Sequence, residues 1–225
     1  MKLNADLSRP AFVDSASLDW VASPSAGVER RMLDRDGDEV ARATSLVRYA
    51  AGSSFAPHTH GAGEEFLVLD GVFSDESGDY PAGWYVRNPP GSKHTPASDP
   101  GAVIFVKLRQ MPQEEAKHVR IDTNESSRWQ DIAAGRREAL LFAAPWEEVR
   151  MIDLDAGYQG PAQPYPNGAE FFVVAGDVAA SGDVDPAIEG RRCGAGAWIR
   201  VPANSTVSLS SEGGARVWRK SGHLG

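Results

Sequence analysis

The sequence contains a single cysteine, Cys193, among its 225 residues. One cysteine excludes an internal disulfide and any zinc site or redox pair of the CxxC type. Arg191 and Arg192 precede this residue and would favour its oxidation, but a free thiol is more often an inert small side chain. The cysteine content therefore gives no reason to expect a disulfide-stabilised or thiol-based protein.

Basic clusters and long apolar runs are also scarce. The formal net charge is −8, and the densest basic cluster is Arg136-Arg137, which argues against a nucleic-acid partner because phosphate binding needs clustered lysine and arginine. The longest apolar stretch, ALLFAAPW (139–146), is too short to span a bilayer, and the N-terminal MKLNADLSRPAF has no apolar signal core. We therefore expect a cytoplasmic protein with no membrane association.

Short β-strands account for most of the apolar sequence. The chain has 23 glycines and 15 prolines between short runs of β-branched and aromatic residues, as many strands joined by tight turns require. No long amphipathic helical pattern is present. The expected strands form two sets: 43–50, 65–73, 83–87 and 101–110, then 138–143, 148–154, 169–178, 197–202, 205–211 and 214–220.

These two sets correspond in order, which indicates an internal duplication. GSSFAPHTH matches GYQGPAQPY, EEFLVLDG matches AEFFVVAG, and GWYVRNPPGSKH matches AWIRVPANSTV. The polar stretch near 112–127 separates the halves, so we expect two domains, 1–112 and 113–225. The fold class is all-β, and each half fits a sandwich or small barrel such as a jelly roll.

Histidines and a glutamate recur at fixed spacing in the first half. The spacing is Gly52-x5-His58-x-His60-x3-Glu64-x6-Gly71, followed by Gly83-x5-Pro-Pro-Gly-x2-His94. Alternate residues of a strand share a face, so His58 and His60 can hold adjacent positions on one ion. A carboxylate and a third histidine from a neighbouring strand would complete the donor set. The predicted metal ligands are therefore His58, His60, Glu64 and His94.

The second carboxylate of the Glu-Glu pair leaves an alternative open. Counting back from Gly71 favours Glu64 as the ligand, although a β-bulge would exchange it with Glu65. We expect Glu65 to be a surface carboxylate. The donor types suit one divalent ion, which can be zinc, copper, iron, nickel or manganese, and they do not decide which.

The second half lacks an equivalent donor set. Its matching positions are Gln163, Tyr165, Glu170 and Val207, and valine cannot bind a metal. We expect this half to be structural and to bind no metal. His118 and His223 are expected to be solvated, the acidic segments SDESGD and SGDVDP to form turns, and Trp84 and Val86 to form the pocket wall, with core packing as the alternative.

The motifs resemble the two sequence motifs of the cupin superfamily, and residues 43–97 resemble the cupin domain of ChrR-type anti-sigma factors. The resemblance implies a tandem cupin (bicupin) with a double-stranded β-helix, or jelly-roll, fold. It also implies a metal, often zinc, on His58, His60, Glu64 and His94. Such cupin domains act in releasing a sigma factor under oxidative stress. The separate cysteine-containing zinc domain that grips the sigma factor in that family has no counterpart here.

Two functions of different classes are therefore expected from the resemblance. The first is a regulatory or stress-sensing metal protein in transcription control, with a sigma factor or a small-molecule ligand as partner. The alternative is a mononuclear non-haem dioxygenase acting on a diketone-like or hydroxyketone substrate, since related cupins have that activity. A bicupin can form the equivalent of a dimer within one chain, so either a monomer or a homodimer is expected.

Overall fold

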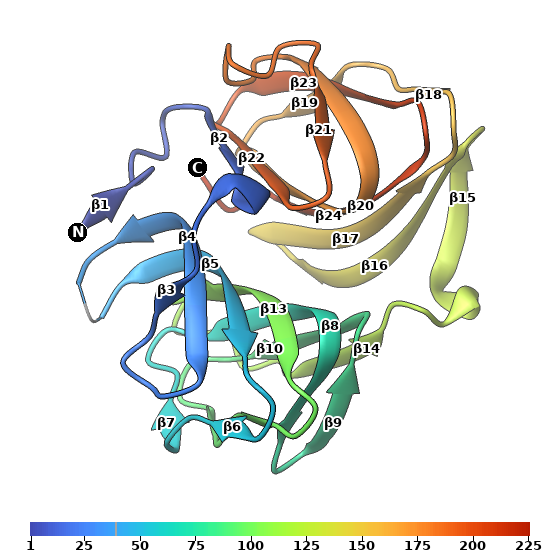
Figure 1. Cartoon of the computed structure of the whole chain (residues 1–225). Coiled ribbons are helices and arrows are strands. Elements are labelled where there is room, and N and C mark those ends of the chain that lie inside the picture. The colour runs from blue at the N-terminus through green and yellow to red at the C-terminus, as the bar shows by residue number, and fades with distance from the viewer. Residues whose placement is uncertain (39) are drawn as a thin grey trace. The chain divides into compact units, whose positions relative to one another are not determined.

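The computed structural model describes residues 1–38 and 40–225, and it is almost entirely β-structure (Figure 1). Two short 3-10 helices, η1 (Ser15–Ser17) and η2 (Ser126–Arg128), are the only helices in these residues. No helix among them is long and apolar enough to cross a membrane. The chain divides into two compact units, residues 1–5 with 18–124 and residues 6–17 with 125–225.

Unit 1 is an antiparallel β-structure whose main sheet has the strand order β1-β4-β5-β13-β8-β10-β14. A smaller group, β6, β12 and β9, pairs with the far part of β8 or with one another, and β7 pairs with β11. The strands are β1 (Lys2–Leu3), β3 (Val21–Ala22), β4 (Val28–Asp36), β5 (Arg42–Tyr49), β6 (Ser53–Ser54), β7 (His58–Thr59), β8 (Glu64–Asp75), β9 (Gly78–Pro81), β10 (Trp84–Asn88), β11 (Lys93–His94), β12 (Ala97–Ser98), β13 (Ala102–Leu108) and β14 (Val119–Asp122).

Unit 2 repeats this arrangement with the main strand order β15-β16-β17-β24-β20-β22-β2. Its β18, β19 and β21 pair with β23 or with the far part of β20. The strands are β2 (Ala11–Asp14), β15 (Trp129–Ala133), β16 (Arg136–Ala144), β17 (Glu147–Leu154), β18 (Tyr158–Gln159), β19 (Gln163–Tyr165), β20 (Ala169–Gly182), β21 (Arg192–Gly194), β22 (Ala197–Val201), β23 (Ser205–Ser211) and β24 (Ala215–Ser221).

The unit boundary differs from the expected division between residues 112 and 113. Strand β14 lies inside the polar stretch that we expected to be a linker, and it pairs with β10 of unit 1, Trp84 opposite Asp122. Near the N-terminus, β2 pairs with β22 of unit 2, Ala11 opposite Arg200 (Figure 1). Residues 6–17 therefore belong to unit 2, which the sequence pattern did not indicate.

The long strand β8 changes partners at Gly71, where the two groups of strands in unit 1 meet. Gly71 has φ 70°, and a Cβ atom there would lie 1.9 Å from the Gly101 carbonyl oxygen. Gly176 of β20 has φ 74° and the same 1.9 Å clash, with the carbonyl of Gly214. Only glycine fits such a position, so the duplicated glycine of the motif marks the bend of each long strand.

Each unit has its own apolar core between its sheets. In unit 1 the core combines inward residues of β8, β10 and β13 with aromatic side chains of the smaller group. Its buried members are Val28, Tyr49, Phe66, Val68, Phe73, Tyr80, Val86, Ala102, Ile104 and Val106. The larger core of unit 2 is built in the same way from β17, β20, β22, β23 and β24. An all-β fold of two such units matches the expected tandem jelly-roll architecture.

Candidate metal centre

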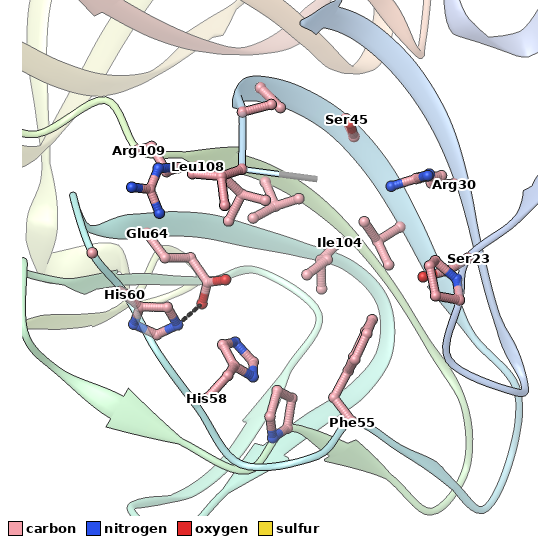
Figure 2. Close-up of a pocket in the computed structure, with 18 of the residues that line it drawn as sticks. Ser23, Arg30, Ser45, Phe55, His58, His60, Glu64, Ile104, Leu108 and Arg109 are labelled. Atoms are coloured by element: carbon pink, nitrogen blue, oxygen red, sulfur yellow. Dashed lines mark ion pairs between the residues drawn. The ribbon is translucent and has the colours of Figure 1, made fainter. Parts of the chain in front are cut away.

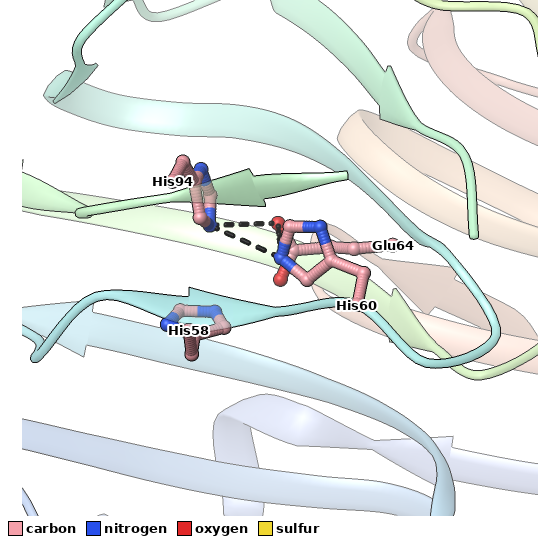
Figure 3. A group of neighbouring side chains, drawn as sticks. All are labelled: His58, His60, Glu64 and His94. Atoms are coloured by element: carbon pink, nitrogen blue, oxygen red, sulfur yellow. Dashed lines mark hydrogen bonds and ion pairs between the residues drawn. The ribbon is translucent and has the colours of Figure 1, made fainter. Parts of the chain in front are cut away.

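Three short segments of unit 1 carry the predicted ligands to one place. Strand β7 bears His58 and is followed directly by His60, and β11 bears His94, which is the register partner of His58. Glu64 is the first residue of β8. The ligand atoms of these four residues all lie within 4.8 Å of one another (Figure 3). The fold thus brings together the four residues of the motif, although His58 and His94 are far apart in the sequence.

Two imidazole nitrogens and one carboxylate oxygen converge at the centre of this cluster. The Nε2 atoms of His60 and His94 are 3.2 Å apart, and Oε1 of Glu64 is 3.5 Å from each of them. All three side chains are buried, while His58 is half-buried. The ring centroids of His58 lie 5.1 Å from His60 and 4.9 Å from His94. The four groups form a compact donor set.

The tautomer of His60 follows from the hydrogen bonds of Ser92. The Ser92 hydroxyl donates to the Pro89 carbonyl at 2.6 Å, so its proton is already used. Its oxygen lies 3.0 Å from Nδ1 of His60 and must act there as the acceptor. Nδ1 of His60 therefore carries the proton, and Nε2 presents its lone pair to the cluster.

The other two imidazoles are held in the same tautomer. Nδ1 of His94 lies 3.2 Å from Oδ2 of Asp75, and Nδ1 of His58 lies 3.1 Å from the Ala56 carbonyl oxygen. Both partners accept hydrogen bonds, so both Nδ1 atoms are protonated and both Nε2 atoms carry lone pairs. A carboxylate or carbonyl on the outer nitrogen is the usual support of a metal-bound histidine.

These lone pairs provide the test of whether a metal fits. Oε1 of Glu64 is buried and has no hydrogen-bond partner among the described residues. Neutral His60 and His94 offer it no proton, since their Nε2 atoms are acceptors. A buried carboxylate facing only acceptors is costly unless a cation lies between them. Nitrogen and carboxylate donors suit zinc, iron, nickel or manganese, so the residues present fit a divalent ion.

The two buried histidines have pKa values shifted in opposite directions. Burial lowers the pKa of His60, and it outweighs the attraction of Glu64. Burial also acts to lower the pKa of His94, but the hydrogen bond that His94 donates to Asp75 and the charge of Glu64 outweigh it and raise the pKa above 6.5. In the metal-free protein, His94 is therefore the imidazole that takes up a proton first.

A cavity of about 490 Å³ opens directly from the cluster, and its size is typical of small-molecule sites. His58, His60 and Glu64 form part of its wall (Figure 2). The rest of the lining includes apolar side chains of β5 and β13, Phe55 and three arginines. The candidate metal centre therefore faces a preformed space that can hold an organic molecule.

Trp84 and Val86 do not line this cavity among the described residues. Val86 is fully buried within the apolar core of unit 1, and Trp84 packs against that core with its ring 5.6 Å from that of Tyr80. These two residues therefore pack in the core, which was the alternative to the pocket wall. The described cavity wall instead includes residues of strands β4, β5 and β13.

The expectation that Glu65 is a surface carboxylate is wrong. Glu65 is 2% exposed, and its Oε2 accepts hydrogen bonds from the Tyr85 hydroxyl at 2.6 Å and from Arg87 at 3.0 Å. Arg87 is fully buried and also lies 3.8 Å from Glu115. The alternation along β8 does point Glu64 and Glu65 in opposite directions, as expected, but the outward face of this sheet is buried as well.

The register of unit 2 corrects the correspondence of the glutamates. Glu65 of β8 lies opposite Arg87 and Lys107, and Glu170 of β20 lies opposite Arg200 and Lys220. Glu170 is therefore the counterpart of Glu65. The residue before it, Ala169, occupies the position of Glu64. Gln163 lies opposite Val207, as His58 lies opposite His94.

The remaining histidines differ in their surroundings. His118 is exposed, as expected. His223 is not solvated: its side chain is 6% exposed, and Nε2 lies 3.0 Å from Oε1 of Glu170. Among the described residues, the only group of histidine, cysteine and acidic side chains close enough to hold a metal is the one in unit 1.

Sequence reasoning missed Asp75 and Ser92, which support the candidate ligands. SDESGD contains the expected turn at residues 76 and 77, and Asp75 just before it is the last residue of β8, with its side chain 2% exposed. Ser92 lies in the loop before β11. The available signal for Ser92 was its place inside the Pro-Pro-Gly-x2-His segment, whereas nothing in the sequence linked Asp75 to His94.

Residues 8–112 match the family model described as the ChrR cupin-like domain. No curated protein matches the chain. Among solved structures, a cupin 2 conserved barrel domain protein from Leptotrichia buccalis is similar at 11% identity and TM-score 0.65, covering 97% of this chain and 99% of its own. Salicylate 1,2-dioxygenase from Pseudaminobacter salicylatoxidans gives 11% identity and TM-score 0.69, with coverage of 96% and 84%.

A mutant of oxalate decarboxylase from Bacillus subtilis is similar at 11% identity and TM-score 0.63, covering 95% of this chain and 77% of its own. These similarities concern the fold, and they extend over both units. Together with the family match, the duplicated jelly-roll topology and the His-x-His, Glu and His positions, they lead to one conclusion. Residues 8–112 form a cupin domain of the ChrR cupin-like family, and the chain as a whole has the tandem cupin fold.

Proposed function

We propose that this protein is a mononuclear metal-dependent oxygenase that acts on a small organic molecule bound in the cavity of unit 1. The observation that carries the proposal is the shared wall: His58, His60 and Glu64 belong both to the donor cluster and to the lining of the 490 Å³ cavity. A molecule in the cavity would lie against the metal. A purely structural metal site would have no need of such a space.

The residues of this chain have separable roles in that proposal. His58, His60, Glu64 and His94 would hold the ion, and a bound Fe(II) would supply the oxygen chemistry that protein side chains lack. Asp75 and Ser92 keep the Nδ1 protons in place, so each Nε2 stays available as a donor. The apolar wall limits the access of water to the reacting face.

The test compares metals and substrates in one assay. Metal-free protein is loaded anaerobically with Fe(II) or Zn(II), the bound metal is quantified, and oxygen uptake is followed with a panel of diketones, hydroxyketones and aromatic hydroxy acids. We expect uptake only with Fe(II) and with at least one compound class. His118→Ala should behave like the wild type, since His118 is exposed and distant from the cluster in sequence. A fully loaded iron protein that consumes no oxygen with any of these compounds would refute the oxygenase.

A second function is favoured by a separate observation, the match of residues 8–112 to the ChrR cupin-like domain. On that basis the protein would be a metal-containing stress-sensing regulator, with zinc in the site and an extracytoplasmic-function sigma factor as partner. Pull-down of the zinc-loaded protein against the sigma factors of its own cell tests this directly. Metal-dependent capture of one sigma factor supports the regulator, and no capture by wild-type protein counts against it.

A further inference from the structure

The cavity beside the metal centre has a second polar end (Figure 2). Glu64 lies opposite Leu108 of β13, whereas Arg30 of β4 lies opposite Val47 of β5, which in turn lies opposite Ile104. Arg30 and Glu64 both line the cavity. They are three strands apart, which is about 14 Å across the sheet at 4.8 Å per strand, and four residues apart along it, because Ile104 lies opposite Val68 and Leu108 opposite Glu64. The view shows Ile104 and Ser45 between the two ends.

Arg30 has no ion-pair partner among the described residues, unlike Arg48 of the neighbouring strand. Arg48 pairs with Glu29, and Arg31 stacks over the ring of Trp20 with its Cζ 4.5 Å from the centroid. In residues 1–38 and 40–225, Arg30 has neither an ion pair nor a side-chain hydrogen bond, and its Nε atom is buried without a partner. A guanidinium left in this state costs free energy that a bound anion would recover.

The charged residues around the cavity also favour an anionic ligand. Three arginines, Arg30, Arg35 and Arg109, line it, whereas Glu64 is its only described carboxylate. Burial, followed by the charge of Arg30, lowers the pKa of Arg35, as expected of two cations near each other. A positive cavity in a chain with net charge −8 favours an anionic ligand.

The surface between the two ends is mainly apolar. It can cover the hydrocarbon part of a ligand, because its side chains offer neither charge nor a strong hydrogen-bonding group apart from the hydroxyls of Ser45 and Tyr49. The lining here consists of Val47, Tyr49, Phe55, Ile104, Val106 and Leu108.

We propose that the cavity binds an organic acid with an apolar body, whose carboxylate pairs with Arg30 while its opposite end faces His58, His60 and Glu64. The guanidinium suits a carboxylate in a bidentate arrangement, which a neutral amide cannot reproduce. This assignment of a substrate class rests on the proposed function for the role of the metal end, but the binding of the acid itself needs no turnover.

The test measures binding by isothermal titration calorimetry on zinc-loaded, full-length protein. The probes are octanoate, phenylbutyrate and naphthoate, each compared with its uncharged amide. We expect at least one acid to bind about 10- to 100-fold more tightly than its amide, the range for a hydrogen-bonded charge pair. Arg30→Gln should remove this preference, and Arg30→Lys should retain part of it because the charge remains.

Arg31→Gln is the matched control, since Arg31 is the next residue of the same strand and contacts Trp20 instead of the cavity. Its preference for the acid should equal that of the wild type. The proposal is overturned if no acid binds more tightly than its amide, or if Arg30→Gln and Arg30→Lys both keep the full preference. Wild-type protein that does not load metal would count against the proposed oxygenase, whereas metal-loaded wild-type protein with no preference for any acid would count against this proposal alone.

Discussion

The substitution Asp75→Asn probes the outer support of the metal centre with almost no change in shape. Oδ1 of Asp75 accepts hydrogen bonds from the Ser77 amide at 2.8 Å and from the Tyr80 hydroxyl at 3.1 Å. Oδ2 faces Nδ1 of His94 at 3.2 Å. Asp75 therefore accepts on both oxygens, and its side chain is almost fully buried.

An asparagine cannot satisfy all of these donors. If its oxygen replaces Oδ1, its NH₂ group faces His94 and forces the proton of that imidazole onto Nε2, where the metal should bind. If the amide is flipped, the NH₂ group faces the Ser77 amide instead, which is also a donor. Loss of such outer partners typically lowers metal affinity 10- to 100-fold, or about 1.4 to 2.8 kcal/mol. We expect the upper part of this range, because both orientations conflict.

The assay is competition for zinc against a chromophoric chelator at neutral pH. Asp79→Asn is the control, since Asp79 lies in the same hairpin and accepts a hydrogen bond from the Ser74 hydroxyl at 2.7 Å, on the exposed side. It should bind zinc as the wild type does. Equal zinc affinity of Asp75→Asn and wild type would refute the tautomer argument, and an equal loss in Asp79→Asn would assign the effect to the hairpin as a whole.

Four further predictions concern the same unit. The double substitution His58→Ala and His94→Ala should abolish metal binding, while exposed His118→Ala leaves metal content unchanged; retained metal in the double variant would overturn the ligand assignment. Burial acts to lower the pKa of His94, but two neighbouring carboxylates outweigh it and raise the pKa above 6.5. As the pH is lowered, zinc affinity should therefore start to fall while the pH is still above 6.5, because protons compete with zinc for Nε2. Because of the same raised pKa, protonated His94 stabilises the metal-free protein below pH 6.5, and this stabilisation is lost as the pH rises through the folded-state pKa. The melting temperature of the metal-free protein, measured as a function of pH, checks this prediction. Glu65→Ala should lower the free energy of unfolding by about 3 to 5 kcal/mol, since it leaves the buried charge of Arg87 without this partner. Chemical denaturation measures that loss, and a change below about 1 kcal/mol would show that the pair is not needed.

Most strands could be predicted because their apolar and β-branched residues follow the strand period. The expected ranges 43–50 and 205–211 agree with β5 (Arg42–Tyr49) and β23 (Ser205–Ser211) to within one residue. Strand β4 was missed because VERRMLDRD places charges on both of its faces, and its buried residues include Asp34 as well as Leu33. Predicting a strand from alternating apolar and polar residues fails where both faces of the sheet are covered and polar residues are buried in pairs.

The donor residues could be predicted from spacing, but their supports could not. Alternation along one short segment places the side chains of His58 and His60 on the same face. The position of Glu64 follows from its spacing to the glycine at the bend of β8. Asp75, in contrast, reaches His94 only because the far part of β8 folds over β11, and that geometry depends on packing rather than on a local pattern. The burial of Glu65 depends equally on what covers the outer face of the sheet.

The duplication separates the charges that maintain the fold from those available for chemistry. Both units keep a buried glutamate on the outward face of the long strand, Glu65 hydrogen-bonded to Tyr85 and Glu170 hydrogen-bonded to the Trp198 indole at 2.9 Å. On the inward face, Glu64 is replaced by Ala169, and none of the three histidines has a histidine counterpart. Unit 2 folds around an apolar core without these donors, so the fold does not require them. In unit 1 these donors include a buried carboxylate that faces only hydrogen-bond acceptors, which is unfavourable in free energy. A bound cation would remove this unfavourable contribution.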